Sequence, residues 1–355
     1  STRFKGKVGL GFGVFSNKLE AMPAVCINHS SRWPSVIAKT GLILLFANMV
    51  LAVIFPVYAS PATPSLTTFP LGQEDWPTVG TGAGSMRFEQ LSIQEGLSDN
   101  SVLAVFQDSL GFLWFGTQEG LNKYDGYEFI VYTADLDNPD SLSDSTITAL
   151  AETEDGTFWV GTRNGGLNRF DPNTQIFTQV DLGSEAGADL ASGVNALLVD
   201  SEDRVWVGTR GGLTRLDPGD QSVIHFQHDP NDGGSLSNNE VLSLFEDQVG
   251  QLWAGTANGL NRLERDETFS RYLTGVSSGV STVTSMVGDG NGNLWFGSLG
   301  GLVRFDIELG TYQVFRHNPN DPNSLPSNGV SSLFMDRSDR LWIGFEDQGI
   351  GLMQV

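Results

Sequence analysis

Leu113-Trp114-Phe115-Gly116-Thr117, followed by Gly120-Leu121-Asn122-Lys123-Tyr124-Asp125, sets the pattern for most of this chain. Matching stretches recur at intervals of 42 to 47 residues, each with a hydrophobic residue, Trp, a second small or hydrophobic residue and Gly. The six repeated tryptophans are Trp114, Trp159, Trp206, Trp253, Trp295 and Trp342. A period of this length indicates one supersecondary unit repeated along the chain.

The second copy shows what this unit is. Short runs of β-branched, aromatic and aliphatic residues at 147–151, 158–160, 167–170 and 175–180 are separated by turns rich in Gly, Asp and Asn. Four antiparallel strands in about 45 residues make one propeller blade. A helical solenoid would need a 3.6-residue apolar period, which the copies lack. We therefore expect an all-β chain whose residues 86–355 form a β-propeller of about six four-stranded blades.

The repeated residues are expected to have structural roles, because a packing device recurs and a ligand site is usually unique. The Trp offers apolar area between twisted sheets, and the Gly two residues later allows close approach. An acid six residues before the Trp is expected to accept turn amides; these acids are Asp108, Asp200, Asp247, Asp289 and Asp336, and Thr153 is the exception. A basic residue two positions after the Gly-Leu leucine, present in every copy but the last, is expected to pair with a carboxylate; these residues are Lys123, Arg169, Arg215, Arg262 and Arg304.

The sixth copy is shorter than the others. Its Gly-Leu pair is predicted at Gly351-Leu352, which makes the preceding loop the longest of the six, and the copy stops in its third strand. An open array would leave an unpaired strand edge. Two interpretations stay open: residues 86–92, which resemble a fourth strand, complete the last blade, or the blade is truncated.

Three segments precede the repeats. Residues 1–40 form a basic leader that begins with Ser1, so that part of it could come from upstream translation or an incomplete reading frame. Residues 41–59 are apolar and uncharged, and predict either the hydrophobic region of a signal peptide or an uncleaved membrane helix. Residues 60–85 are rich in Pro, Thr, Gly and Ser and predict a disordered linker. Basic residues before the apolar segment place the repeats outside the cytoplasm.

The charge of the repeats excludes one class of partner. The chain has 20 basic and 42 acidic residues, a net charge of −22, and the basic leader makes the repeat region still more acidic. Such a surface repels phosphate backbones, so nucleic acid is not an expected partner. The single Cys26 lies in the leader, which leaves the repeats without a disulfide.

The sequence contains no recognisable catalytic or metal motif. It has four histidines, and His228 and His317 occupy matching places in two copies, which favours a loop role over metal binding. Paired cysteines, a His-Glu-x-x-His stretch and a Gly-x-Ser-x-Gly stretch are all lacking. We expect no cofactor and no metal; calcium at the Asp- and Asn-rich turns is a less favoured alternative, because carboxylates in turns usually cap backbone amides.

Candidate ligand-binding residues follow from the propeller geometry. The loop between the second and third strands of each blade and the connection into the next blade should lie at the same end of the disc. Residues that differ between copies on these loops are where specificity can be encoded. They are Gln118, Glu119, Arg163, Asn164, Arg210, Asn258, Glu346, Asp347 and Gln348.

At the level of the whole repeat, the chain resembles the two-component regulator propeller family. The likeness is carried by residues 96–102, 107–117 and 120–126, and by Asn- and Asp-rich connections such as residues 138–143, 231–237 and 320–325. The resemblance implies a periplasmic sensor propeller of a membrane signalling protein, joined to a histidine kinase or a diguanylate cyclase. Propellers of that family usually have seven blades, often two in tandem, whereas six copies and no output module are found here.

The leading hypothesis is a non-catalytic sensor on the periplasmic or extracellular side of the inner membrane. Its expected partners are a small molecule or glycan and, as an alternative, a second propeller or a homodimer. Contact with the membrane would run through the N-terminal segment or a C-terminal helix outside the sequence. A secreted propeller enzyme, of polysaccharide lyase or hydrolase type, and a protein-interaction scaffold are the alternative hypotheses.

Overall fold

The computed structural model describes residues 90–183, 193–219, 222–276 and 279–355. Over these ranges the chain forms 23 β-strands and no helix, in six antiparallel sheets, which confirms the predicted all-β propeller. No helix in these ranges is long and apolar enough to cross a membrane. The predicted leader, signal or membrane segment and linker, residues 1–85, lie outside the described residues.

Each sheet is one blade, numbered here in chain order. Blade 1 holds β1 (Val102–Gln107), β2 (Leu113–Thr117), β3 (Leu121–Tyr124) and β4 (Phe129–Tyr132), and blade 2 holds β5 (Ile147–Glu152), β6 (Phe158–Thr162), β7 (Leu167–Asp171) and β8 (Ile176–Val180). Blade 3 holds β9 (Val194–Val199), β10 (Val205–Thr209), β11 (Leu213–Asp217) and β12 (Ser222–Phe226), and blade 4 holds β13 (Val241–Glu246), β14 (Leu252–Thr256), β15 (Gly259–Leu263) and β16 (Phe269–Tyr272). Blade 5 holds β17 (Ser285–Gly288), β18 (Asn293–Ser298), β19 (Gly301–Asp306) and β20 (Tyr312–Phe315), and blade 6 holds β21 (Val330–Met335), β22 (Arg340–Phe345) and β23 (Ile350–Gln354).

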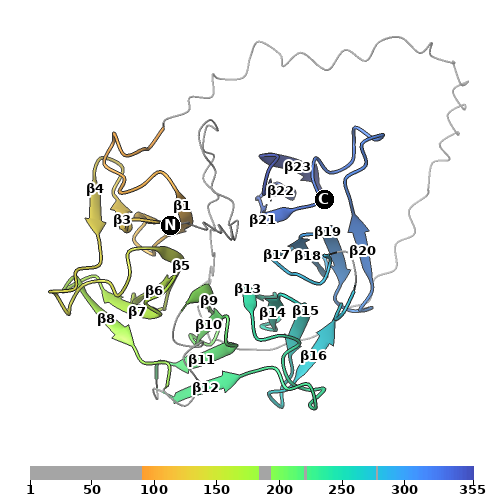
Figure 1. The fold of residues 1–355 in the computed structure, drawn as a ribbon, viewed down its shortest axis with the longest axis horizontal. Helices are drawn as coiled ribbons and strands as arrows, with labels where there is room; N and C mark the ends of the chain where they lie inside the picture. The colour runs from red at the N-terminus through yellow and green to blue at the C-terminus, as the bar shows by residue number, and fades with distance from the viewer. Residues whose placement is uncertain (1–89, 184–192, 220–221, 277–278) are drawn as a thin grey trace, which may run out of the picture. The chain divides into compact units, whose positions relative to one another are not determined.

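The strands of every blade pair in chain order, so each blade is a simple meander. The first strands β1, β5, β9, β13, β17 and β21 lie innermost, and the fourth strands lie at the perimeter (Figure 1). Blade 6 has three strands among the described residues. Residues 90–92 form no strand, and residues 86–89 lie outside the described ranges, so whether this segment completes the blade stays a prediction.

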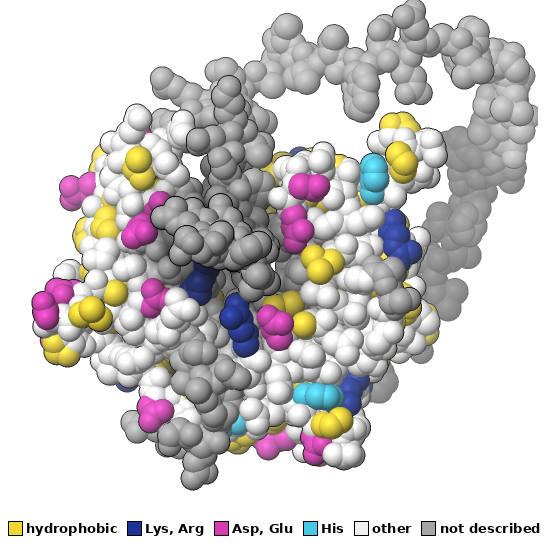
Figure 2. All heavy atoms as spheres, in the orientation of Figure 1, with side chains coloured by type: hydrophobic (Ala, Val, Ile, Leu, Met, Phe, Trp, Pro, Cys, Tyr) yellow, Lys and Arg dark blue, Asp and Glu magenta, His cyan; other side chains and the backbone are white. Residues whose placement is uncertain are grey.

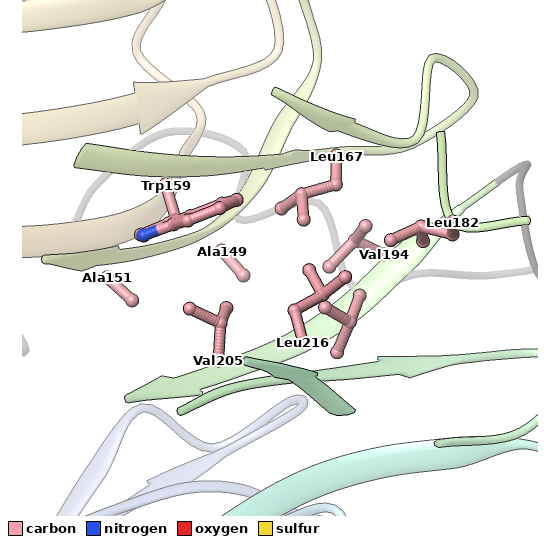
Figure 3. Close-up of a cluster of buried hydrophobic side chains, with 9 residues drawn as sticks. Ala149, Ala151, Trp159, Leu167, Leu182, Val194, Val205 and Leu216 are labelled. Carbon is pink, nitrogen blue, oxygen red and sulfur yellow. The ribbon is translucent and has the colours of Figure 1, made fainter. Parts of the chain in front are cut away.

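The hydrophobic core lies between successive sheets. Figure 3 shows one of these layers, in which Trp159, Leu167 and Ala149 of blade 2 face Val194 and Val205 of blade 3. Equivalent layers join blades 1 and 2, 3 and 4, 4 and 5, and 5 and 6. Burial of one such aliphatic or aromatic side chain contributes about 1.5–3 kcal/mol, so blade-to-blade contact supplies much of the stability.

The repeated Gly has a specific role at these layers. A Cβ added to Gly161 would lie 2.6 Å from Cγ1 of Val194, the first residue of β9 in the next blade. No side chain can therefore replace this hydrogen without moving the neighbouring blade. A Cβ built on the matching Gly of the other blades would lie 2.5–2.8 Å from a methyl carbon of the Ile or Val that begins the next blade. These pairs are Gly116 and Ile147, Gly208 and Val241, Gly255 and Val283, and Gly297 and Val330.

The repeated acid binds the repeated Trp, which the sequence analysis did not foresee. Oδ2 of Asp200 accepts a hydrogen bond of 2.7 Å from Nε1 of Trp206, while Oδ1 accepts the turn amides of Glu202 and Arg204. The predicted capping of turn amides is therefore confirmed, but it is half of the role. The indole–acid bond recurs at Asp108, Asp247, Asp289 and Asp336 with lengths of 2.8–3.4 Å, and Thr153 accepts it in blade 2.

The repeated basic residue also has a different main partner from the one predicted. It is the cross-strand neighbour of the Trp, for example Arg262 beside Trp253, and its charge lies over the indole ring at 5.8 Å. Lys123, Arg215 and Arg304 lie over the Trp of their own blade in the same way. Carboxylate partners occur in some copies only, such as Glu264 for Arg262. A cation–π contact is thus the recurrent interaction, with a salt bridge added in places.

The strand register corrects the alignment of the sixth copy. Gly344 pairs with Ile350, as Gly116 pairs with Leu121 in blade 1, and the amide of Phe345 donates to the carbonyl of Gly349. The sixth Gly-Leu pair is therefore Gly349-Ile350, and the prediction of Gly351-Leu352 was wrong. The prediction failed because it looked for the residue pair Gly-Leu, whereas the strand pairing puts Ile350 at the position that Leu holds in the other blades. The sixth loop consequently has the same length as the loop of blade 2.

Candidate functional site

The nine candidate residues lie on the loops that join the second and third strands of blades 1, 2, 3, 4 and 6. Gln118 and Asn258 are half-buried, and the other seven are exposed. Arg163 and Arg210 are the basic residues of the set, on the loops of adjacent blades 2 and 3. Acidic side chains are scattered over the face of the molecule that Figure 2 shows, with few basic ones among them.

A hydroxyl at the end of the second strand shapes each of these loops. Oγ1 of Thr117 donates to the carbonyl of Gly120 at 2.9 Å and accepts the amide of Glu119 at 3.2 Å. Thr256 does the same for Gly259 and Asn258. The hydroxyl replaces a backbone partner inside a tight turn, which explains why Thr or Ser follows the repeated Gly in five copies. It fixes the path of the loop and so the direction of the variable residues.

A buried polar network ties these turns to the connection that precedes the blade. In blade 1, Asn122 on β3 accepts the amide of Ser98 and donates to its hydroxyl, both at 2.8 Å, and Ser98 Oγ lies 2.8 Å from Thr117 Oγ1. In blade 4, Ser237, Thr256 and Asn261 make the same three contacts at 2.8–2.9 Å. In blade 2, Asn168 and Ser143 make two of the contacts. All their polar groups are satisfied, so the network holds the loop end rigid.

Blade 6 replaces all three positions of this network by apolar residues or Gly. Pro326, Phe345 and Gly351 stand where blade 4 has Ser237, Thr256 and Asn261. The ring of Phe345 is fully buried, and a Cβ on Gly351 would lie 3.0 Å from its Cε2. The loop with Glu346, Asp347 and Gln348 is therefore positioned by packing, without the hydroxyl that fixes the other loops.

The loops contact the residues that lead into the first strands, as the propeller geometry predicts. Oγ1 of Thr146, directly before β5, donates to the carbonyl of Gln118 at 3.1 Å, and the carbonyl of Thr146 accepts the amide of Arg163 at 2.9 Å. Thr146 thus joins the loops of blades 1 and 2. Thr282, three residues before β17, donates to the carbonyl of Ala257 in the blade 4 loop at 3.2 Å.

Other candidate residues contact residues of the connections at the same end of the propeller. The backbone amide and Nδ2 of Asn164 donate to Oδ2 of Asp144 at 2.8 and 3.2 Å, and Oδ1 of Asn258 accepts the amide of Gly275 at 3.1 Å. Nε of Arg210 lies 4.0 Å from Oε1 of Glu240, which directly precedes β13 of the next blade. The two asparagines are therefore partly engaged in loop structure, and the Arg210 pair is loose and solvent-exposed.

Sequence reasoning missed four residues that contact the candidate loops from the connections between blades: Thr146, Asp144, Glu240 and Thr282. Their signal was positional: each lies one to three residues before a first strand, where the connection meets the loop of a neighbouring blade. The copies differ at these positions as they do at the loops.

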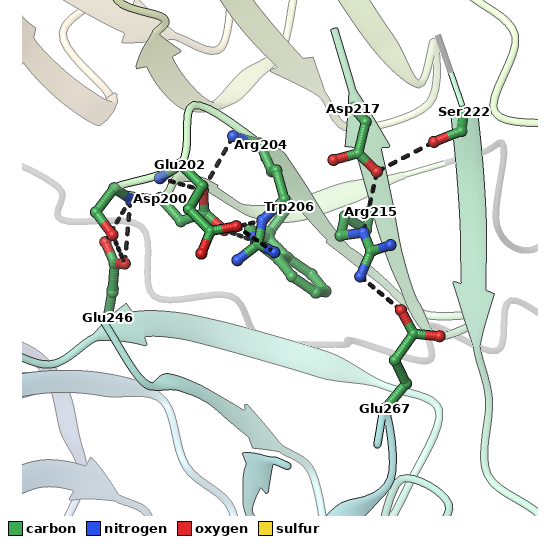
Figure 4. Close-up of polar contacts among 10 residues, drawn as sticks. Asp200, Glu202, Arg204, Trp206, Arg215, Asp217, Ser222, Glu246 and Glu267 are labelled. Carbon is green, nitrogen blue, oxygen red and sulfur yellow. Dashed lines mark hydrogen bonds and ion pairs between the residues drawn. The ribbon is translucent and has the colours of Figure 1, made fainter. Parts of the chain in front are cut away.

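The opposite end of the blades carries structural ion pairs. Figure 4 shows Arg204 on Asp200, and Arg215 bridging Asp217 of its own blade and Glu267 of blade 4 at 3.1 and 2.9 Å. The carboxylate of Glu246 on blade 4 accepts from the amide and hydroxyl of Ser201 on blade 3. The Arg215–Glu267 and Ser201–Glu246 contacts thus link blade 3 to blade 4.

The histidines of the described ranges have structural partners. Nδ1 of His228 lies 2.6 Å from the carbonyl of Leu236, and Nδ1 of His317 lies at the same distance from the carbonyl of Leu325. Nδ1 of His225 lies 3.0 Å from Oγ1 of Thr214. Over the ranges that the structure describes, no group of three or more His, Cys, Asp or Glu residues is arranged to hold a metal ion.

Comparison with known proteins identifies the repeat. Six segments match the model of the two component regulator propeller: residues 96–119, 141–164, 190–211, 235–258, 277–300 and 324–347. These six segments are two component regulator propeller repeats. Each ends in the loop between the second and third strands of a blade, so the resemblance noted from the sequence is confirmed.

Two further similarities concern a two component system and a histidine kinase. The extracellular domain of BT3049, a hybrid two component system of B. thetaiotaomicron, is 25% identical to this chain, with a TM-score of 0.53. The match covers 74% of this chain and 41% of that domain. Histidine kinase P4 of Formosa agariphila is 47% identical over 45 residues, which is 13% of this chain and 3% of the kinase. The chain therefore spans less than half of either protein.

Virginiamycin B lyase from Staphylococcus aureus is also similar in structure, with 15% identity and a TM-score of 0.56. The match covers 73% of this chain and 82% of the lyase. At this identity the likeness concerns the propeller fold alone, because one fold supports many activities.

Proposed function

We propose that this propeller is the extracytoplasmic sensor part of a membrane signalling protein and is not itself catalytic. The observation that carries the proposal is the 25% identity, over 74% of this chain, to the extracellular domain of a hybrid two component system. The short match to a histidine kinase points in the same direction. The output would be a histidine kinase or a diguanylate cyclase on the other side of the membrane, and the propeller would lie on the periplasmic or extracellular side.

The ligand proposed for the loop end is a small molecule or a glycan. Arg163 and Arg210 lie on the loops of adjacent blades, and a guanidinium group offers five N–H donors to hydroxyl or carboxylate oxygens. Around them, Gln118, Asn164 and Asn258 offer amide groups. The Thr- and Ser-based turns beneath these residues hold the loops in place, so that binding would not have to order them.

Binding to immobilised and soluble oligosaccharides, neutral and acidic, tests the proposal by calorimetry or thermal shift. Arg163→Ala combined with Arg210→Ala should weaken binding by tenfold or more, since each lost charge-assisted hydrogen bond is worth about 1.5–3 kcal/mol. The matched control is Arg265→Ala combined with Arg337→Ala, which removes the same charge from exposed positions at the opposite end of the blades. Equal loss in both variants would mean a non-specific charge effect.

The same panel tests the absence of catalysis. New reducing ends or unsaturated products after incubation with any polysaccharide would contradict a purely sensory role. Binding without turnover, lost in the loop-end variant alone, is the outcome expected of a sensor.

A further inference from the structure

Blade 3 carries two guanidinium groups on a single indole ring. Arg204 directly precedes β10, Arg215 lies on β11, and both side chains are partly buried and extend toward Trp206 (Figure 4). The two guanidinium carbons lie 5.8 and 5.7 Å from the centre of the Trp206 ring, which is itself fully buried. The end of blade 3 opposite to the candidate loops therefore holds two fixed cations close to each other.

This pair of arginines is particular to blade 3. Two residues before the repeated Trp, the other blades have Phe112, Thr157, Gln251, Asn293 and Arg340. Blade 6 has the first arginine, Arg340, but Leu352 lies across from its Trp where blade 3 has Arg215. A packing device recurs from blade to blade, and this pair does not. It is therefore not part of the repeated packing.

An open cavity of about 620 Å³ lies beside the two guanidinium groups. Its other walls are Glu202 and Asp203 of the β9–β10 turn, Asp217 at the end of β11, and Pro218 and Gly219 of the turn that follows. Cavities that bind small molecules have volumes of about 300–1,000 Å³. The space beside the arginines is thus large enough for a ligand of the size of one or two sugar rings.

The salt bridges of the pair hold both guanidinium groups in place and leave part of each unused. Nε and Nη1 of Arg204 lie 2.7 and 2.8 Å from carboxylate oxygens of Asp200 and Glu202. Nε and Nη1 of Arg215 lie 3.1 and 2.9 Å from those of Asp217 and Glu267. Among the described residues, Nη2 of both arginines and Oδ1 of Asp217 have no partner. Donors and an acceptor are therefore oriented before a ligand arrives.

The charge around the cavity restricts the ligand class. Two guanidinium groups face five carboxylates, which gives a formal charge of −3; the acids are Asp200, Glu202, Asp203, Asp217 and Glu267. This excess repels an anionic ligand. A simple ammonium ion offers no acceptor to the Nη2 donors, whereas a hydroxyl group accepts from a guanidinium and donates to a carboxylate. Several adjacent hydroxyl groups on an uncharged molecule match the cavity best.

We propose that this cavity binds a neutral polyol of the size of a hexose or a cyclitol. Adjacent hydroxyl groups accept from Nη2 of Arg204 and of Arg215 and donate to Oδ1 of Asp217. The exposed ring of Pro218 provides an apolar wall for the carbon skeleton. The site lies at the opposite end of the blades from the nine loop residues, so it is separate from the ligand site proposed above and does not depend on it.

Saturation-transfer NMR of the full chain with glucose and with myo-inositol tests the proposal. We expect dissociation constants in the millimolar range. Glucuronate has the same ring with a carboxylate and should bind tenfold more weakly or worse, because the acidic surroundings repel it. Putrescine, a diamine without hydroxyl groups, should not displace glucose.

Two variants alter the cavity without touching the salt bridges of Arg204. Gly219→Trp places an indole at the cavity wall, where a Cβ meets nothing within 4 Å. Its control is Gly233→Trp, at an equally open glycine in the connection between blades 3 and 4. Asp217→Asn replaces the acceptor by an amide, and its control is Asp171→Asn at the same strand position in blade 2. Both cavity variants should weaken glucose binding by tenfold or more, and both controls should leave it unchanged.

The proposal is overturned if glucose shows no saturable binding at about 50 mM, well above the expected range. It is also overturned if either cavity variant binds glucose as the wild type does, if glucuronate binds as tightly as glucose, or if putrescine displaces glucose. Loss of glucose binding in Arg163→Ala combined with Arg210→Ala, with retention in the cavity variants, would place the polyol at the candidate loops instead. That result would leave the proposed sensor role intact, so the two proposals fail separately.

Discussion

The indole Nε1 of Trp206 donates a hydrogen bond of 2.7 Å to Oδ2 of Asp200, six residues earlier and across the turn between β9 and β10. Both side chains are buried, and the same carboxylate accepts from two turn amides and from Nε of Arg204. One acid therefore closes the turn and fixes the ring that packs against the next blade. A local motif and a long-range packing layer depend on the same two residues.

Asp200→Ala is expected to destabilise the propeller by about 2–4 kcal/mol. The substitution leaves the indole N–H and two amides without a buried acceptor, and each unsatisfied group costs about 1–3 kcal/mol before relaxation. Urea unfolding followed by tryptophan fluorescence measures the change in the free energy of unfolding. Glu202→Ala, an exposed acid of the same turn, is the control and should change stability by less than about 0.5 kcal/mol. Similar losses in both variants would contradict a special role for Asp200.

Acid is expected to weaken blade 6 through Asp336. The hydrogen bond from Nε1 of Trp342, with those from the Arg340 and Ser338 amides, holds the pKa of Asp336 well below its ordinary value of 3.8. A carboxyl with a lowered pKa in the folded state stabilises the fold above its unfolded pKa and loses this contribution as the pH falls below it. The stability difference between the wild type and Asp336→Asn should therefore be largest near pH 7 and shrink from about pH 4 downward. A difference that stays constant between pH 7 and pH 3 would show that the charge of Asp336 contributes nothing.

The blade architecture could be predicted because the sequence repeats at a regular period, and a local misalignment does not change that period. Misplacing the sixth Gly-Leu by two residues changed neither the number of blades nor their order. The partner of Arg262 could not be predicted, since it depends on which residue of β14 lies across the ladder from it. The turn amides bound by Asp200 are close in sequence and were foreseen, whereas the indole of Trp206 reaches it only after β10 has paired with β9.

At the candidate site, too, the position of the residues could be predicted from the sequence and their side-chain contacts could not. Propeller topology places Gln118 and Arg163 at one end of the molecule, and this follows from strand order alone. That Thr146 joins their loops, or that Asp144 binds Asn164, depends on side-chain directions in the connections. The position of these residues before the first strands places them near the loops, but it does not tell which atoms they bind. Ligand binding by the nine residues remains a prediction for the experiments above.

Gly161→Ala and Val194→Ala are each expected to destabilise the propeller, and their effects on the free energy of unfolding are expected to be non-additive when combined. The added methyl of Gly161→Ala forces Val194 away, at a cost of about 1–3 kcal/mol. Val194→Ala leaves a cavity and costs a similar amount. In the double variant the new methyl occupies part of the space that Val194 leaves, so the combined loss should fall short of the sum by about 0.5–3 kcal/mol. Chemical unfolding of all four proteins measures the coupling, and strict additivity would contradict direct packing between the two residues.

Gly219→Ala is the matched control for the glycine substitution. A Cβ at Gly219 meets nothing within 4 Å, so its change in stability should be close to zero or slightly favourable. A loss at Gly219 as large as that at Gly161 would mean that backbone conformation, and not contact with the next blade, explains the repeated Gly.

The apolar replacement of the polar network in blade 6 predicts a dependence among three positions. Phe345→Thr alone should cost about 3–5 kcal/mol, because it empties a fully buried site and places a hydroxyl there without partners. Gly351→Asn alone should also destabilise, since its Cβ would meet the Phe345 ring at 3.0 Å. The triple variant Pro326→Ser, Phe345→Thr and Gly351→Asn recreates the set that blade 4 holds as Ser237, Thr256 and Asn261, and should recover most of the loss. Thermal and urea unfolding of the singles and the triple variant decide the matter: if the triple variant is no more stable than Phe345→Thr, the three positions do not act as a unit.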